Sequence, residues 1–238
     1  MAGTAANRSI QIQGEDMELA GASLCADLSG ALYWPDQRLL CVADLHFEKG
    51  SSFARRGQFL PPYDTRATLA RLQQVIVRYE PRIVICLGDN FHDGDGPARL
   101  SEDDREALSA LQRGRDWIWI AGNHDPDPAA GIGGHFCDQI KIDEVAFRHE
   151  PSAQGDEPEI AGHLHPLARV STRGRMVSRK CFARNDRRMV MPAFGAFTGG
   201  LNVRHAAFQS VFDGADFVAH MLGTTRLYAV SAVRCLPD

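Results

Sequence analysis

Residues 38–46 read RLLCVADLH, an apolar run that ends in a carboxylate and an imidazole. The arrangement recurs as RIVICLGD at 82–89 and DWIWIAGNHD at 116–125. The apolar runs predict buried strands over 38–43, 82–87 and 116–121. Because helical patterns separate the three runs, their order predicts a parallel sheet in which ligands bind beyond the carboxyl ends of the strands.

Both connecting segments carry helix signals. Asp64 or Thr65 is expected to cap a helix that runs to about Tyr79, because apolar residues recur there with helical period. Ser101 is expected to cap a second helix over 103–112, whose first turn holds acidic residues that the helix dipole favours.

After Pro128 the pattern changes to alternating strands, expected at 139–147, 159–161, 167–171, 176–178 and 188–191, with two more after residue 206. The sequence contains no repeat and no low-complexity linker. We therefore expect a flexible tail over residues 1–9 and a single domain over 10–238 with two packed sheets.

The composition is that of an ordinary soluble protein, with 238 residues, 44% hydrophobic, 24% charged and a net charge of −4. The N-terminus has no apolar segment of the signal-peptide kind, and no apolar run is long enough to cross a bilayer. The six cysteines form no CxxC pair. These features predict a cytoplasmic protein with reduced thiols and no membrane partner.

A fourth motif, GHLHP at 162–166, adds two imidazoles to the carboxylates, amide and imidazoles of the strand ends. Each motif alone is a weak signal, but their ordered occurrence at successive strand ends is specific. The mixed ligand set favours Mn, Fe or Zn over Mg or Ca. Two such ions roughly 3.5–4 Å apart would clamp a phosphoryl group and turn the water between them into a hydroxide nucleophile.

Together, D-x-H, GD, GNHD, a further His and GHxH resemble the motif series of the calcineurin-like metallophosphoesterases, over roughly residues 40–166. That resemblance implies an α/β fold, a four-layer α-β-β-α sandwich with two mixed sheets flanked by helices. It also implies a dinuclear centre of two divalent transition-metal ions, for which we favour Mn, with Zn or Fe as alternatives.

The resemblance also implies a role for each motif residue. Asp44, His46 and His165 would bind the first ion, Asn123 and His163 the second, and Asp89 would bridge both. His124 would face the scissile phosphate without binding metal, and could donate a proton to the leaving oxygen.

Three assignments stay open at this stage. The remaining ligand of the second ion is His149 or His135, and we favour His149 because a strand end holds a ligand more rigidly than a glycine-rich loop. Asp125 either orients His124 or forms a turn before a proline. Of the other histidines, only His92 is considered as a functional group, because it lies three residues after the bridging aspartate. The others are interpreted as structural or surface groups.

Longer stretches of sequence indicate one subgroup of this family. They are DLHFEKG (44–50), FLPPYDT (59–65), GDNFHD (88–93), HEP (149–151) and PAFGAFTGGLNV (192–203). With GHLHP they resemble the ligase-associated DNA-damage-response metallophosphoesterases. The implication is a manganese-dependent DNA endonuclease or phosphodiesterase of bacterial DNA repair, acting beside an ATP-dependent DNA ligase, a helicase and an exonuclease. The alternatives are a small-molecule or nucleotide phosphodiesterase or phosphatase, and a non-catalytic scaffold.

One feature supports DNA independently of the resemblance. Eight basic side chains lie between Arg169 and Arg188, opposed only by Asp186, in a chain that is acidic overall. Such a segment predicts contact with a nucleic-acid backbone without base reading, but a solvated hairpin edge explains it equally well. The residues chosen as DNA contacts are Arg173, Arg175 and Arg179, followed by Arg55 and Arg56 in an expected polar loop over 50–62. No aromatic platform of the kind found in single-strand binders is evident.

Overall fold

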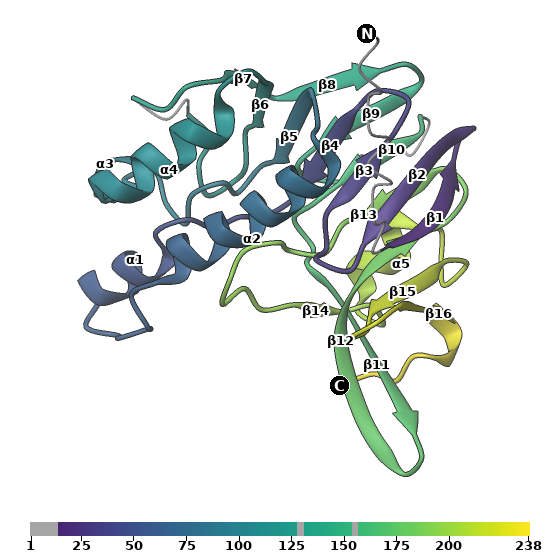
Figure 1. Cartoon of the computed structure of the whole chain (residues 1–238). Helices are drawn as coiled ribbons and strands as arrows, with labels where there is room; N and C mark the ends of the chain where they lie inside the picture. The colour runs from purple at the N-terminus through teal and green to yellow at the C-terminus, as the bar shows by residue number, and fades with distance from the viewer. Residues whose placement is uncertain (1–13, 128–130, 154–156) are drawn as a thin grey trace, which may run out of the picture.

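The computed structural model describes residues 14–127, 131–153 and 157–238. Two β-sheets pack face to face, and the longest helices cover the outer face of one of them (Figure 1). The tail expected over residues 1–9 lies outside the described residues. Within the described part of the chain, no helix combines the length and apolar character that crossing a membrane requires.

The first sheet has seven strands in the order β1-β2-β3-β4-β5-β6-β7. The four strands from β4 to β7 are parallel, and the others join them as antiparallel neighbours. The three buried strands predicted from the sequence are confirmed as β4, β5 and β6. The strands are β1 (Gly14–Leu19), β2 (Ala22–Asp27), β3 (Leu32–Trp34), β4 (Leu39–Val42), β5 (Ile83–Leu87), β6 (Asp116–Ile120) and β7 (His135–Cys137).

Two helices, α2 (Asp64–Tyr79) and α4 (Glu102–Gln112), pack on one face of this sheet through a buried apolar cluster. Both predicted helices are confirmed, and Ser101 caps α4 by accepting a hydrogen bond from the Asp104 amide at 3.1 Å. A short helix, α3 (Gly96–Arg99), precedes α4.

The predicted loop over 50–62 is wrong in its first part, because residues Lys49–Arg55 form helix α1. The predicted cap of α2 is also wrong. Tyr63 occupies that position without a side-chain bond, whereas Asp64 Oδ2 accepts from the Gly50 amide at 3.0 Å and Thr65 Oγ1 from the Glu48 amide at 2.8 Å. The two side chains therefore hold the start of α1 instead of the start of α2, an arrangement between segments that local propensity does not encode.

The second sheet has nine strands, with β14-β11-β12-β13-β10-β9-β8 in order, β15 paired with β12, and β16 paired with β15. Strands β9, β10 and β13 are parallel neighbours. The predicted strand over 139–147 is divided by a turn at Asp143, and the one at 176–178 is much longer than expected. The elements are β8 (Gln139–Ile142), β9 (Val145–Arg148), β10 (Glu159–Ala161), β11 (Pro166–Thr172), β12 (Arg175–Arg184), β13 (Arg188–Val190), β14 (Leu201–Asn202), α5 (Ala206–Val211), β15 (Val218–Leu222), β16 (Leu227–Ser231) and a 3₁₀ turn (Ala232–Arg234).

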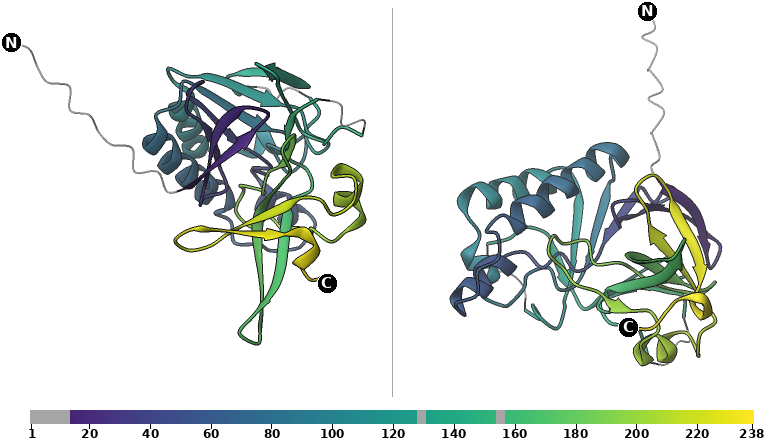
Figure 2. Two further views of the ribbon diagram at one scale, coloured as in Figure 1. Left: turned by 90° about the vertical axis from the view of Figure 1, so that its right-hand side faces the viewer. Right: turned by 90° about the horizontal axis from the view of Figure 1, so that it is seen from below.

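The main core lies between the two sheets, where side chains such as Leu87 and Ile120 meet Phe147 and Phe182 of the second sheet. On the outer face of the second sheet the helical layer is reduced to α5, which packs through Phe208. Helices, sheet, sheet and short helix give the expected four-layer α/β architecture, seen from two further sides in Figure 2.

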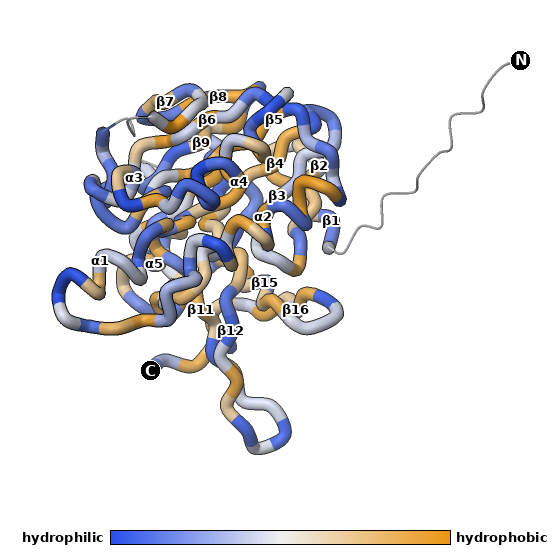
Figure 3. Tube along the Cα trace, turned by 60° about the vertical axis from the view of Figure 1, so that its left-hand side comes forward, coloured by the Kyte–Doolittle hydropathy of each residue, from blue (hydrophilic) through white to orange (hydrophobic). Residues whose placement is uncertain are grey.

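Strands β11 and β12 continue beyond the body as a hairpin (Figures 2 and 3). Arg173 and Gly174 form its tip with φ of 49° and 73°, and the strand pairing ends at Thr172 opposite Arg175. Positive φ at both central residues is the requirement of a type I′ turn, which matches the twist of a two-stranded ribbon.

Candidate active site

The motif residues follow the carboxyl-terminal ends of strands from both sheets and lie close together. Asp44, Asp89 and Asn123 follow the parallel strands β4, β5 and β6. His149 and His163 follow the parallel strands β9 and β10 of the second sheet. Because the two sheets pack face to face, five carboxyl-terminal strand ends meet around one space.

The backbone of these loops is strained in a way that brings the side chains close. Asp44, His46, Asp89, His163 and His165 all have φ between 44° and 69°, a region that non-glycine residues seldom adopt. Such strain is maintained only where the surrounding structure holds it, as at functional sites.

The glycines of the motifs are required by close approach. A Cβ atom on Gly122 would lie 2.1 Å from the Asp89 backbone nitrogen, and one on Gly88 would lie 2.5 Å from the ring of His149. The GD and GNHD motifs therefore need glycine so that the neighbouring loops can touch.

One group of possible ligand atoms consists of Asp44, His46, Asp89 and His165, all within 4.8 Å of one another. The Nε2 atoms of His46 and His165 face each other at 3.3 Å, and His165 Nε2 lies 3.2 Å from Asp44 Oδ1. His46 Nε2 lies 3.7 Å from Asp89 Oδ2.

A second group consists of Asp89, His149 and His163, again within 4.8 Å of one another. The Asn123 Oδ1 atom joins it, at 3.0 Å from both His149 Nε2 and His163 Nδ1. His149 Nε2 lies 3.4 Å from Asp89 Oδ1. Asp89 thus presents one carboxylate oxygen to each group. The alternative ligand His135 is exposed, begins β7 and belongs to none of the ligand groups found in the described residues.

The protonation of the imidazoles suits metal binding. His149 Nδ1 donates to the Leu87 carbonyl at 2.9 Å, which leaves the Nε2 lone pair directed at the second group. Burial, together with the neighbouring His165, His124, His92 and Lys49, lowers the pKa of His46 to about 2. Burial and the adjacent His149 also lower the pKa of His163. Imidazole nitrogens, an amide oxygen and carboxylate oxygens that converge in this way form a donor set that fits two cations.

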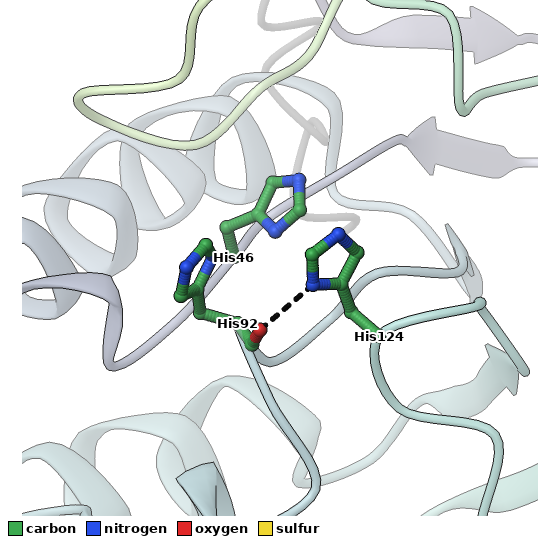
Figure 4. A group of neighbouring side chains, drawn as sticks. All are labelled: His46, His92 and His124. Atoms are coloured by element: carbon green, nitrogen blue, oxygen red, sulfur yellow. Dashed lines mark hydrogen bonds between the residues drawn. The ribbon is translucent and has the colours of Figure 1, made fainter. Parts of the chain in front are cut away.

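A third group of possible ligand atoms, from His46, His92 and His124, shares His46 with the first group, and Figure 4 shows its three rings facing one another. His124 Nδ1 donates to the His92 carbonyl at 2.9 Å, and the two rings stack with centroids 5.3 Å apart. Burial, with Lys49 and His124 nearby, lowers the pKa of His92 to about 4. In the sequence, the only signal that singled out His92 was its position three residues after Asp89.

Asp125 does not hold His124 as one of the two sequence interpretations expected. Its Oδ2 accepts from the Asn90 and Phe91 amides at 2.9 and 3.1 Å. Asp125 therefore fixes the loop after Asp89, while the His92 carbonyl orients the His124 ring. Burial raises the pKa of Asp125 to about 6, although those backbone bonds oppose the shift.

The basic segment divides into internal and exposed members. Lys180 Nζ donates to the Ala193 carbonyl at 2.8 Å and to Thr198 Oγ1 at 2.6 Å, and buried Arg188 pairs with Glu159. Both side chains are bonded within the fold instead of projecting from the hairpin. The exposed members on the hairpin include Arg173, Arg175 and Arg179.

The second set of arginines lies on and just after α1. Arg55 pairs with Asp95 at 2.8 Å, with both side chains mostly exposed, and Arg56 is exposed. In Figure 1 α1 lies at the lower left and the hairpin at the bottom, with the loop that precedes β14 between them in that view.

Comparison with solved structures finds a nuclease of Pseudomonas putida, termed MPE, at 28% sequence identity and a TM-score of 0.73, with 91% of this chain and 100% of that chain covered. Two further matches are a phosphoesterase of E. coli, YfcE (12% identity, TM-score 0.39, 82% and 98% covered), and Vacuolar Protein Sorting 29 of Cryptosporidium parvum (16%, 0.33, 81% and 94%). A comparison with curated protein sequences finds no significant match.

The calcineurin-like phosphoesterase family model matches residues 37–179, more than half of the chain and all of the strand-end motifs. Family sequence pattern, two-sheet architecture and the ligand groups at the strand ends agree. The chain belongs to the calcineurin-like phosphoesterase family.

Proposed function

We propose that this phosphoesterase is a DNA endonuclease that hydrolyses phosphodiesters at a dinuclear centre, with Mn²⁺ as the favoured metal and Zn or Fe as alternatives. The observation that carries the proposal is the placement of Asp89. Its Oδ2 faces the His46 group and its Oδ1 faces the His149 group, so that one carboxylate can serve two ions.

The side chains of this site would serve as ligands for two separate ions. Asp44, His46 and His165 would hold one ion, Asn123, His149 and His163 the other, and Asp89 both. When bound, two such ions acidify a water and offset the negative charge that develops on phosphoryl oxygens. The protein supplies imidazole, carboxylate and amide ligands on loops held by hydrogen bonds, so the geometry is set before substrate arrives.

His124 is the proposed proton donor to the leaving oxygen or to a nonbridging one. Its Nδ1 is engaged by the His92 carbonyl, so Nε2 remains for the substrate. The side chain is 40% exposed, which leaves it reachable from solvent, whereas His46 beside it is 5% exposed. This difference supports proton transfer by His124 and ligation by His46.

DNA as the substrate rests on two supports. The chain is 28% identical over 91% of its length to a protein described as a nuclease, and the arginines of the hairpin and of the α1 region are exposed. Binding would follow the backbone charge without base reading. We also propose a cytoplasmic role in DNA repair beside an ATP-dependent DNA ligase, a helicase and an exonuclease, on the resemblance of the motif stretches.

The test crosses a panel of Mn²⁺, Zn²⁺, Fe²⁺, Mg²⁺ and Ca²⁺ with circular single-stranded DNA, duplex DNA, nucleotides and an activated aryl phosphodiester. Asp89→Ala should abolish turnover on all substrates. The matched control is Asp116→Ala, at the start of β6 and far along the strand from the motif end. Full activity of metal-stripped protein in excess chelator contradicts the metal mechanism. Nucleotide hydrolysis without DNA cleavage would instead indicate the small-molecule phosphodiesterase.

A further inference from the structure

Two aromatic rings from distant parts of the chain are exposed and lie next to each other. Tyr63, just before α2, is 58% exposed, and Phe197, in the loop before β14, is 45% exposed. Their ring centroids lie 6.3 Å apart with planes at 58°. Phe59, in the same loop as Tyr63, is 87% exposed. A single exposed ring is ordinary, whereas exposed rings that adjoin each other make a candidate binding surface.

The loop that carries Phe197 is held rigidly against the first metal motif. The Phe194 and Gly195 amides donate to the carbonyls of Ala43 and Asp44 at 2.8 and 3.1 Å. The next amide, at Ala196, donates to Thr68 Oγ1 at 2.9 Å. Phe197 itself has a φ of 58°, a strained value for an aromatic residue. Its exposure therefore belongs to an ordered loop.

Lys49 connects the rings to the histidine cluster. Its Nζ donates to the Phe197 carbonyl at 3.1 Å and lies 5.7 Å from the centroid of the Phe53 ring. The Phe53 ring in turn lies 5.4 Å from that of His92. A cation thus connects the Phe197 backbone with the Phe53 ring, which contacts His92, the stacking neighbour of His124.

We propose that Tyr63 and Phe197 form a stacking subsite for an unpaired nucleobase adjacent to the scissile phosphodiester, with Lys49 next to the strand's backbone. Rings with accessible π-faces beside a cation are the combination that binds single strands without sequence preference. A base in a duplex is already stacked and paired, so the subsite selects single-stranded segments. The aromatic platform absent from the sequence pattern is created by the fold, which joins residues 63 and 197.

This inference rests on the proposed function, so its test includes a binding measurement that does not need turnover. The variants are Tyr63→Ala, Phe197→Ala and both together, with Tyr63→Phe as the variant that keeps the ring. Tyr228→Ala is the matched control, because Tyr228 is also 45% exposed but lies on β16. The substrates are a single-stranded oligonucleotide, the same strand with abasic positions flanking the cleaved bond, and the base-free aryl phosphodiester.

The double alanine variant should raise the KM for the intact oligonucleotide about tenfold, the effect of losing one stacked base. It should change the KM for the abasic strand and for the aryl diester little, and Tyr63→Phe and Tyr228→Ala should behave as the parent. Retained aryl diester hydrolysis shows that the variant is folded. Equal KM increases for intact and abasic strands, or no increase for either, overturn the proposal.

Fluorescence anisotropy of a labelled oligonucleotide in EDTA measures binding without cleavage. A parent that cleaves no diester but loses about tenfold in oligonucleotide affinity in the double variant refutes the proposed function while supporting the subsite. Sedimentation addresses a different occupant. A parent dimer that the double variant dissociates, with oligonucleotide affinity unchanged, makes the rings an interface between copies and overturns the proposal.

Discussion

The histidines at residues 46 and 124 share a cluster but differ in burial and in hydrogen bonding. His46 has a buried Nδ1 without a hydrogen-bond partner in the described residues, and its Nε2 faces His165 and Asp89. His124 is partly exposed, with its Nδ1 held by a carbonyl. His46, which faces the ligand groups, is therefore suited to holding a metal ion. His124, which is reachable from solvent, is suited to acting on the substrate.

His124→Ala should therefore retain two metal ions per chain and slow DNA cleavage by about 10²–10⁴-fold, the range for a general acid. An aryl ester with a good leaving group should lose less, because its leaving oxygen needs no proton. Elemental analysis and rate measurements on both substrates check this. His135→Ala, an exposed histidine on β7, is the control. Loss of one ion in His124→Ala would show that His124 is a ligand.

The β11–β12 hairpin is the element that extends farthest from the body (Figure 2). Its base is anchored internally by Lys180 and by pairing with β14, while its outer half exposes Arg173, Arg175 and Arg179. A rigid base with a charged tip suits a contact to nucleic-acid backbone that extends away from the cleavage site.

Changing those three hairpin arginines to glutamate should raise the KM for DNA and flatten its salt dependence, because phosphate contacts release counterions. Aryl diester hydrolysis should stay close to that of the parent. A control with the same charge change uses exposed arginines near the opposite ends of the strands, Arg38, Arg82 and Arg113. Equal DNA cleavage by hairpin variant and parent across a salt series would reduce the hairpin to a solvated edge, with Arg55 and Arg56 next to be examined.

At the scale of the whole molecule, the site should make stability depend on pH. Burial and neighbouring groups lower the pKa of His46 to about 2 and of His92 to about 4, and lower that of His163. Unfolded histidine titrates near pH 6.5. Below that pH these histidines become protonated in the unfolded chain but stay neutral in the native chain. The free energy of unfolding therefore falls as the pH falls, by about 1.4 kcal/mol per pH unit for each fully titrating group.

Urea unfolding of metal-free protein at pH 7.5, 6 and 5 should show this loss of stability toward acid. Asp125 opposes this loss of stability over a narrower pH range. Its pKa is raised to about 6 in the native state, so below that pH the native chain gains a proton before the unfolded chain does. His46→Gln should flatten the pH dependence more than His220→Gln, in which a histidine outside the site with a lowered pKa is removed. Stability that is constant or rises from pH 7.5 to 5 would contradict the prediction.

Local sequence determined the strands that end at Asp44, Asp89 and Asn123 and the helix over 64–79, because apolar period and run length are properties of neighbouring residues. The motif order also indicated which carboxylates, amide and imidazoles would gather. Helix α1 was missed, since its seven residues lack an apolar period and depend on Asp64, and the extent of β12 depends on its partners in the sheet.

Only the tertiary structure decided how side chains far apart in the chain share space. Packing of the two sheets brings His149 and His163 to Asp89 and leaves His135 outside, and contacts across the fold take Lys180 and Arg188 inside. The same packing adds His92 to the site and pairs Tyr63 with Phe197. The number of charged or aromatic residues in a segment does not tell which of them become buried or adjacent, because strand order and the paths of the loops decide both.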